Sequence, residues 1–583
     1  MSTAAVFSRS DRILKREFLH YFFPAMLTTA ALSLSEFVDS MLVANLLDSR
    51  AMAIVQLGMP ITLISAAVYI LLGCGGSTLY AICLGQRDKD KAGKLFGTSI
   101  TVSAAVGVLL TVLAFVFFRP FSKLLCSEAE LYEGFSSYLR VLLLSMPFLI
   151  TVLAFVSFLP PCGAPGMATA INVIANVVNI GMDVVYIKLF KMGPEGAAWA
   201  TVTGYGVGAL VLLIAVLSKK IKIRFRFPKL SDMKLLKEII PMGAPFSVTQ
   251  VGYAIKFAVC GRIAQAFGST AGMEAFSLCV QALSITSIFL AAVMEASQPI
   301  MALLYGQRDY KGEGLVLRNT LILELVFSVA CSLLFFIFAK QAAAIYNITE
   351  PGALTLAVRG LRIFAFSVIS RGVFVTIQKQ AQIIGQKIYP LFISLFDGII
   401  GIIPLCFLLT SLLGIDGLFW AYELTGVLTL VICAVWNIVL VRRSNGRLKG
   451  LFLNVSETES DVVMDATVTN SAEDISAISS TLQKRCLVLG MDEKKAFRTA
   501  LLVEEMGIYL KEQLKGRGYM DILLRSFDDR IEIDFRTIGA EADPNADGGG
   551  EPDANKDILR SMASEIRYDF VMGMNCTEIV INK

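Results

Sequence analysis

The sequence has little of what most enzymes and metalloproteins use at their sites. His20 is its one histidine, which excludes a histidine-based metal site and a conventional histidine kinase. The 11 cysteines include no CxxC pair and are scattered through apolar stretches, a pattern typical of small buried side chains. GxxxxGK followed by Ser or Thr does not occur, so a primary pump with a P-loop ATPase is excluded as well.

Charged residues are also scarce. They make up 17% of the chain, against about 25% in an ordinary soluble domain. Hydrophobic residues reach 55%, with a mean hydropathy of +0.66, which predicts a chain that spends much of its length in lipid. Residues 464–583 carry 15 Lys and Arg against 22 Asp and Glu, whereas the rest carries 37 basic and 26 acidic residues. This asymmetry predicts a basic membrane body with an acidic soluble tail.

Apolar runs long enough to cross a bilayer, about 20 residues each, recur along the membrane body. We expect twelve membrane helices, near residues 18–46, 52–82, 94–118, 134–158, 166–190, 196–218, 239–266, 274–303, 316–339, 360–378, 390–411 and 417–440. The predicted fold class is therefore an all-α membrane protein, followed by a C-terminal α+β domain of the two-layer sandwich type.

Basic residues gather in alternate loops, among them QRDKDKAGK, GQRDYKGEG and RRSNGRLKG. The N-terminal segment before the first apolar run, with Arg9, Arg12, Lys15 and Arg16, falls on the same side. The positive-inside rule then places both termini and the tail in the cytoplasm of a multi-pass protein of the cell membrane.

An internal repeat joins the two halves of the membrane body. GQRD occurs at 85–88 and again at 306–309. The same shift in numbering relates GPEGAAWA to GIDGLFWA and Pro24 to Pro245. Duplicated halves of equal topology are typical of transporters that alternate access to a path at the repeat interface. We expect six-helix lobes at 1–225 and 226–442.

After the last apolar run the composition changes. Residues 443–463 are polar and predict a linker. Residues 464–583 mix helical stretches with strand-like ones, and about 120 residues is an ordinary size for one domain.

Ionisable residues within the apolar runs are costly and therefore indicate function by default. The first half contains Glu36, Asp39 and Asp183; the second contains Lys256, Glu295, Glu324, Arg371, Asp397 and Glu423. For Glu324 and Glu423 we favour a structural ion pair or a position near a helix end. Arg371 and Asp397 suggest an ion pair that fixes helix packing.

Asp183 differs from the others because of Asn179. Four residues apart on a helix, the two side chains share one face. An amide oxygen beside a carboxylate supplies hard ligands for a small cation, or a frame that tunes proton affinity. Coupling of export to an ion gradient requires such a group.

The segments NIGMDVVYI, GPEGAAWAT, FVDSMLVANLL and GCGGSTLYAICLGQRDKDKA resemble the multidrug and toxic compound extrusion family, over roughly residues 15–440. In the branch similar to bacterial DNA-damage-inducible exporters, the resemblance implies a cation site at Asp39, Asn179, Asp183 and Thr201. The sequence departs from the family in VANLLD, where a glycine-containing GRLLG is usual, and the family's second cation site is not traceable here.

The resemblance implies a bacterial secondary antiporter, not an enzyme, that exports organic and often cationic compounds in exchange for H⁺ or Na⁺. No cofactor is expected, and no metal beyond a possible Na⁺ at Asp39 and Asp183. The expected partners are the lipid bilayer, small organic substrates and a cytoplasmic protein bound by the tail, with no nucleic acid. The alternative is a flippase for a lipid-linked or polysaccharide precursor, although such proteins usually have a cationic central cavity.

The tail resembles the ATP-binding domain of anti-sigma-factor kinases, carried by ALLVEEMGIYLKEQ and by ILRSMASEIRYDFVMGMNCTEIVI. Aligned with the family, Glu505 matches its glutamate, but Tyr509 stands where an asparagine holds magnesium. Thr537 and Ile538 precede Gly539 where the family has a DxG aspartate. Both departures remove oxygen ligands, so we expect a degenerate nucleotide site and a regulatory or protein-binding tail.

Overall fold

The computed structural model describes residues 8–46, 49–126, 129–218, 226–346, 348, 350–456, 462–488, 490–513, 518–546 and 554–582. The chain divides into two compact units. The larger holds Tyr21–Asp309 and Leu317–Asn454; the smaller holds Met1–His20, Tyr310–Val316 and Val455–Lys583.

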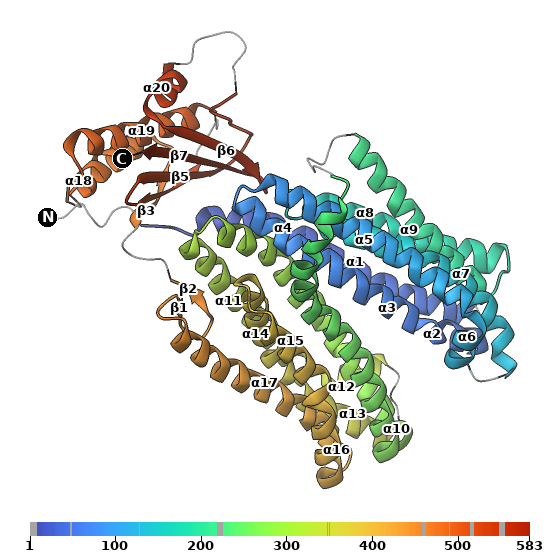
Figure 1. Ribbon diagram of the computed structural model, residues 1–583. Coiled ribbons are helices and arrows are strands. Elements are labelled where there is room, and N and C mark those ends of the chain that lie inside the picture. Colours follow the sequence, from blue (N-terminus) through green and yellow to red (C-terminus); the bar gives the residue numbers. More distant parts are fainter. Residues whose placement is uncertain are drawn as a thin grey trace. The chain divides into compact units, whose positions relative to one another are not determined.

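The helices of the first half lie side by side in Figure 1, in blue to teal. Their bounds are α1 Arg12–Leu46, α2 Ser49–Leu57, α3 Met59–Tyr69, η2 Ile70–Cys74, α4 Gly75–Gly85, α5 Lys89–Val116, α6 Phe118–Leu125, α7 Ala129–Val156, α8 Pro165–Asp183, η3 Val184–Leu189 and α9 Pro194–Leu217. Helix α5 begins where Asp88 accepts a hydrogen bond from the Lys91 backbone N–H, which satisfies a free donor of the first turn.

The second half follows in green to brown (Figure 1). Its helices are η4 Leu230–Leu235, α10 Leu236–Gly306, α11 Tyr310–Ile337, α12 Ala339–Ile345, α13 Pro351–Phe364, α14 Ser367–Ile383, α15 Ile388–Leu395, η5 Phe396–Ile400, α16 Ile402–Leu413 and α17 Asp416–Arg443. Eleven helical segments among the described residues are long and apolar enough to cross a membrane. The chain is thus a mostly helical membrane protein.

Helix α10 contains two of the expected spans, 239–266 and 274–303, in one element of 71 residues. At Ser269 the backbone leaves the helical region, with φ 55° and ψ −148°, a conformation that non-glycine residues seldom adopt. This break divides α10 into two parts, each long enough to cross about 30 Å of hydrocarbon. The count of twelve spans and the two repeats remain predictions.

Glycines bring the backbones of α4 and α10 into contact. A Cβ on Gly85 would clash with the carbonyl oxygen of Leu303, and one on Gly306 with that of Ile82. At the other end of α4, a Cβ on Gly75 would lie 2.7 Å from the backbone N of Gly243, in the part of α10 that precedes Ser269. Only residues without a side chain permit this approach.

The smaller unit contains a five-stranded antiparallel sheet in the order β3-β4-β5-β7-β6. Its elements are β3 Val462–Thr469, α18 Ala472–Val488, α19 Glu493–Gln513, β4 Tyr519–Ser526, β5 Arg530–Ile538, α20 Ala554–Met562, β6 Glu565–Val571 and β7 Met574–Asn582. Ile475, Leu482 and Met506 of the helices share one core with Ile522 and Ile533 of the strands. Helices α18 and α19 therefore cover one face of the sheet, as Figure 1 shows.

Residues 443–463, expected to be a linker, contain a short sheet of β1 Leu448–Lys449 and β2 Asn454–Val455. Asn437 of α17 donates a hydrogen bond to the Leu451 carbonyl at 2.6 Å, so this hairpin is fixed to the last long helix. The smaller unit begins at Val455 in this part of the chain, and the exact domain boundaries stay a prediction.

Candidate functional site

The predicted ion-coupling residues lie on α1, α8 and α9. Glu36 and Asp39 belong to α1, and the side chains of both lie outside the described residues. Asp183 is the last residue of α8 and is 0% exposed. The chain continues from it into the π-helical segment η3, and such irregular turns are frequent at functional sites.

Asn179 and Thr201 lie where α8 and α9 touch. A Cβ on Gly204 would lie 2.9 Å from the Asn179 Cβ, so the two helices meet at this point. Thr201 precedes Gly204 by three residues and therefore shares its face of α9. The Thr201 hydroxyl donates to the Ala197 carbonyl at 3.1 Å. The structure thus places Thr201 on the side of α9 that faces α8.

In the second half, Asp397 pairs with Lys256 and not with Arg371. The Lys256 Nζ lies 3.6 Å from Asp397 Oδ1 and 4.5 Å from the Tyr422 ring centre. The expected Arg371–Asp397 pair is therefore corrected: the Arg371 guanidinium lies over the Tyr253 ring at 4.6 Å. Lys256 forms the pair because its α10 segment packs directly on η5, where Gly252 meets Gly398.

Lys379 is a functional candidate that the sequence analysis missed. Its Nζ donates to Gln298 Oε1 at 2.7 Å, and Gln298 Nε2 donates to Thr78 Oγ1 at 2.6 Å. This chain of polar contacts links α14, α10 and α4. Glu295, an exposed side chain, precedes Gln298 by three residues and shares its face. The expected span ended at residue 378, just before the lysine, which was therefore not recognised as internal.

Two further carboxylates lie in the second half. Glu324 on α11 is 1% exposed, and within the described residues its oxygens have no hydrogen-bond partner. It faces α14, where a Cβ on Gly372 would lie 3.4 Å from Glu324 Oε2. Glu423 on α17 is half-buried. This environment of Glu324, buried and without a partner in the described part of the chain, argues against a structural ion pair there.

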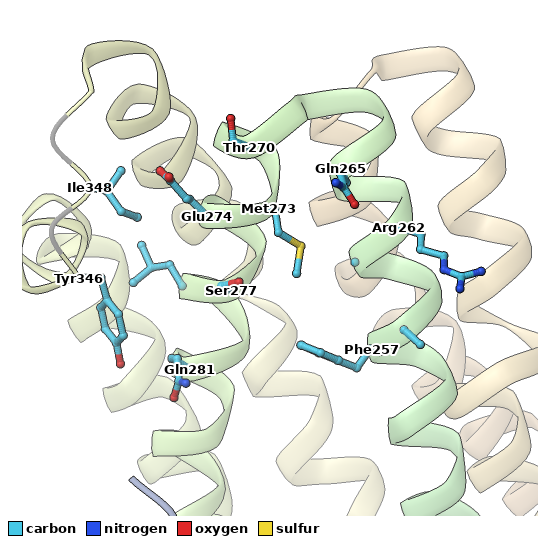
Figure 2. A pocket seen from close by; sticks show the side chains of 13 residues that line it. Phe257, Arg262, Gln265, Thr270, Met273, Glu274, Ser277, Gln281, Tyr346 and Ile348 are labelled. Carbon is cyan, nitrogen blue, oxygen red and sulfur yellow. The ribbon is translucent and has the colours of Figure 1, made fainter. Parts of the chain in front are cut away.

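A cavity of about 620 Å³ lies between the two parts of α10. Figure 2 shows Phe257 and Met273 pointing into it, with Glu274, Ser277 and Gln281 along one part of the helix. Its lining combines apolar and aromatic side chains with polar ones, among them Arg262 and Glu274. Sites that bind small molecules usually combine apolar walls with a small number of polar groups.

In the tail, the structure places two of the predicted nucleotide positions, Tyr509 and Thr537, in the interior. Tyr509 on α19 is 2% exposed and donates from its hydroxyl to the Asp543 carbonyl at 3.0 Å. Asn575 accepts from the Ala542 N–H at 2.9 Å, which fixes the loop that follows Gly539. Thr537 on β5 is 2% exposed. Burial, and then the charge of Glu504, raise the pKa of Glu505 above its ordinary value.

Comparison with known proteins identifies the membrane body. The MatE family profile matches residues 24–185 and 245–408, two segments whose starts are related by the same shift as the two copies of GQRD. The chain belongs to the MatE family. Members are transporters, and this MatE chain is therefore a transporter and not an enzyme.

Similar proteins of bacteria carry names that refer to multidrug export or multidrug resistance. The multidrug export protein MepA of Staphylococcus aureus (strain MRSA252) is 23% identical over 434 residues, which cover 74% of this chain and 94% of MepA. The probable multidrug resistance protein YoeA of Bacillus subtilis is 24% identical, covering 66% and 85%. These bacterial relatives indicate a multi-pass protein of the cell membrane.

Solved structures show the same fold. A MATE transporter in complex with MaL6 has a TM-score of 0.67 at 20% identity, covering 74% of this chain and 97% of that one. An outward-facing multidrug resistance MATE transporter of the MOP superfamily has a TM-score of 0.66 at 19% identity, covering 75% and 99%. A MOP superfamily transporter from Pyrococcus furiosus, described as having a binding pocket of reverse polarity, has 0.67 at 19%, with coverage of 75% and 99%.

Proposed function

We propose that this chain is a secondary antiporter. It exports organic, often cationic, compounds in exchange for H⁺ or Na⁺, by alternating access between two six-helix lobes with both termini in the cytoplasm. The observation that carries the proposal is Asp183, a carboxylate with 0% exposure at the end of α8. A carboxylate inside a membrane-spanning segment is costly and therefore indicates function by default.

The repeat supports alternating access. Gly85 and Gly306 are the first residues of the two GQRD copies. Where α4 crosses α10, each glycine packs against the helical turn that precedes the other. A pseudo-symmetric contact of this kind can close one end of a path and separate when the lobes rotate. The cavity between the parts of α10 is lined by apolar side chains together with Arg262 and Glu274, and so suits an amphiphilic organic compound.

The test is efflux from proteoliposomes under separately imposed proton and sodium gradients. We expect Asp183→Asn and Asp39→Asn to abolish gradient-driven efflux, while Asp416→Asn, which removes an ion pair with Arg359 at the end of another helix, retains it. Intact efflux by Asp183→Asn would disprove the assignment of Asp183. The identity of the driving gradient distinguishes H⁺ from Na⁺.

A flippase for a lipid-linked precursor is the second candidate. It is favoured by Arg371 and Lys379, whose charged groups lie over the Tyr253 and Phe246 rings; within the described residues neither has an ion pair closer than 4 Å. Cations without close counter-ions suit an anionic phosphate. Gradient-independent translocation of a labelled polyprenyl phosphate, with no efflux of organic cations, would favour the flippase.

For the tail, we propose a regulatory role without nucleotide hydrolysis. The hydroxyl of Tyr509 is already bonded to the Asp543 carbonyl, and the tyrosine is part of the core. Isothermal titration of the full-length protein with ATP–Mg tests this proposal. Tight binding would overturn it.

A further inference from the structure

The N-terminal segment is held by the edge strand of the tail sheet, within the smaller unit. The Thr467 backbone N–H donates to the Ser8 carbonyl at 3.3 Å. The Ser10 N–H donates to Thr467 Oγ1 at 2.9 Å. Among the described strands β3 pairs with β4 alone, so its other edge is open to a further strand. Residues 8–10 therefore lie along this edge, held by one backbone hydrogen bond and one to the Thr467 side chain.

Arg9 fixes the position of this segment. Its side chain is 1% exposed, with Nη1 3.1 Å from Asp465 Oδ1 and Nη2 3.2 Å from Asp521 Oδ2. The Thr467 hydroxyl donates to Asp521 Oδ1 at 2.6 Å. The guanidinium therefore lies between two carboxylates from adjacent strands. These would repel each other without it.

The carboxylates face away from the helices of the tail. Ala466, Val468 and Ile522 belong to the core under α18 and α19, and side chains alternate along a strand. Asp465 and Asp521 must then lie on the opposite face. Without its occupant this surface is an acidic edge of an acidic domain, and it is complementary to a basic, extended segment.

Two more contacts extend the surface. The Arg12 guanidinium lies over the Tyr519 ring at 4.8 Å. Lys311, near the start of α11, places its Nζ 3.0 Å from Asp465 Oδ2. Asp465 thus pairs with Arg9 from the segment before α1 and with Lys311 from the start of α11. These two segments come from different halves of the chain.

We propose that the open β3 edge of the tail is a docking surface for a basic extended segment, and that its occupant is the chain's own residues 8–12. Docking restrains the start of α1, the helix that carries Asp39, and the start of α11. The tail is then an inhibitory latch, and transport accelerates when the latch opens. This regulatory part rests on the proposed transport function, whereas the docking part does not.

The docking is tested by cross-linking the full-length chain in membranes. Ser10→Cys is combined with Thr467→Cys, and a protease site is inserted between Ser456 and Val462. After oxidation and cleavage, we expect the two fragments to remain joined until a reductant is added. Lys15→Cys with Thr467→Cys is the matched control and should not join. Separate fragments, or a product joined only between two copies, would overturn the proposal.

The regulation is tested by efflux from proteoliposomes. Arg9→Ala should raise the initial rate by about fivefold, at the low end of the usual coupling between sites. Lys15→Ala removes the same charge from the first turn of α1, outside the docked segment, where Lys15 forms only an exposed pair with Asp11. It should not change the rate. The double variant Arg9→Asp with Asp521→Arg exchanges the two charges. It should restore the slow rate of efflux and, in the Ser10→Cys and Thr467→Cys background, the cross-link between the fragments. Equal rates for Arg9→Ala and Lys15→Ala would overturn the latch.

Failure of the transport proposal has a different signature. In that case no variant shows gradient-driven efflux, while the Ser10→Cys and Thr467→Cys fragments still remain joined. If the fragments separated while efflux was normal, the docking proposal would be disproved and the transport proposal would stand.

Discussion

Gly85 and Gly306 lie against each other: a Cβ on Gly306 would come within 3.0 Å of the Gly85 Cα. Ile82 and Leu303, which supply the facing carbonyl groups, each precede their glycine by three residues and are thus equivalent positions of the repeat. The contact is therefore symmetric: equivalent residues of the two repeats make equivalent contacts with each other.

A methyl group at this contact should force α4 and α10 apart. We expect Gly85→Ala or Gly306→Ala to lower the free energy of unfolding by about 1–3 kcal/mol, as overpacking does. Thermal unfolding in detergent measures the change. Gly352→Ala is the control, because nothing lies within 4 Å of a Cβ there. Equal unfolding temperatures for all three variants would contradict the contact.

Lys379 and Phe246 should stabilise each other through the 3.3 Å contact between Nζ and the ring centre. We expect Lys379→Met and Phe246→Leu to show a coupling energy of about 1–2 kcal/mol in a double-mutant cycle. The cycle is measured by thermal unfolding. Strictly additive effects would mean that the cation and the ring do not interact.

Glu505 should make the stability of the tail depend on pH. Its pKa is raised by burial above the ordinary 4.5, so the unfolded chain ionises first as the pH increases. Its contribution to stability is then fully present below pH 4.5 and is lost as the pH rises through the folded pKa. Hydrogen exchange in α19 of the full-length protein, compared at pH values below and above this range, should show the loss in the wild type.

Glu505→Gln should remove that dependence, because the amide does not ionise. Glu512→Gln, an exposed position on the same helix, serves as the control and should leave the dependence intact. If Glu505→Gln responded to pH as strongly as the control, the burial of Glu505 would not be the cause.

Tyr509 should contribute in two separable ways. Tyr509→Phe removes only the hydroxyl that donates to Asp543, at a cost of about 1 kcal/mol. Tyr509→Asn also removes the ring from the core and should cost about 3 kcal/mol or more. Hydrogen exchange across the tail gives both values. A Tyr509→Asn protein as stable as wild type would show that the ring does not fill the core.

The sequence predicted the positions of the membrane helices well, because long apolar runs form a strong local signal. Motifs such as NIGMDVVYI predicted a transporter of the multidrug and toxic compound extrusion family, and the family match confirms the family. The sequence could not show that the two spans around Ser269 are joined by so tight a turn that a Cβ on Gly272 would clash with the Ala264 carbonyl oxygen. That turn is set by a single residue's backbone conformation, which composition does not reveal.

Charge pairing was harder to predict than helix position. Lys256, Arg371 and Asp397 all lie in apolar runs, and the sequence offers no basis for choosing which cation meets Asp397. The partner is determined by the contact between Gly252 of α10 and Gly398 of η5, which are distant in the chain and which bring Lys256 close to Asp397. Arg9 was interpreted only as a topology signal, because its partners Asp465 and Asp521 lie in the tail, beyond the whole membrane body.

The contact between Arg9 and Asp465 also constrains the order of folding during synthesis. The two residues are separated by 456 positions. At the usual elongation rate, roughly 20–90 s pass between their appearance at the ribosome. During that interval the membrane helices are made while the N-terminal segment has none of its partner strands. The first residues to be synthesised therefore complete their fold among the last.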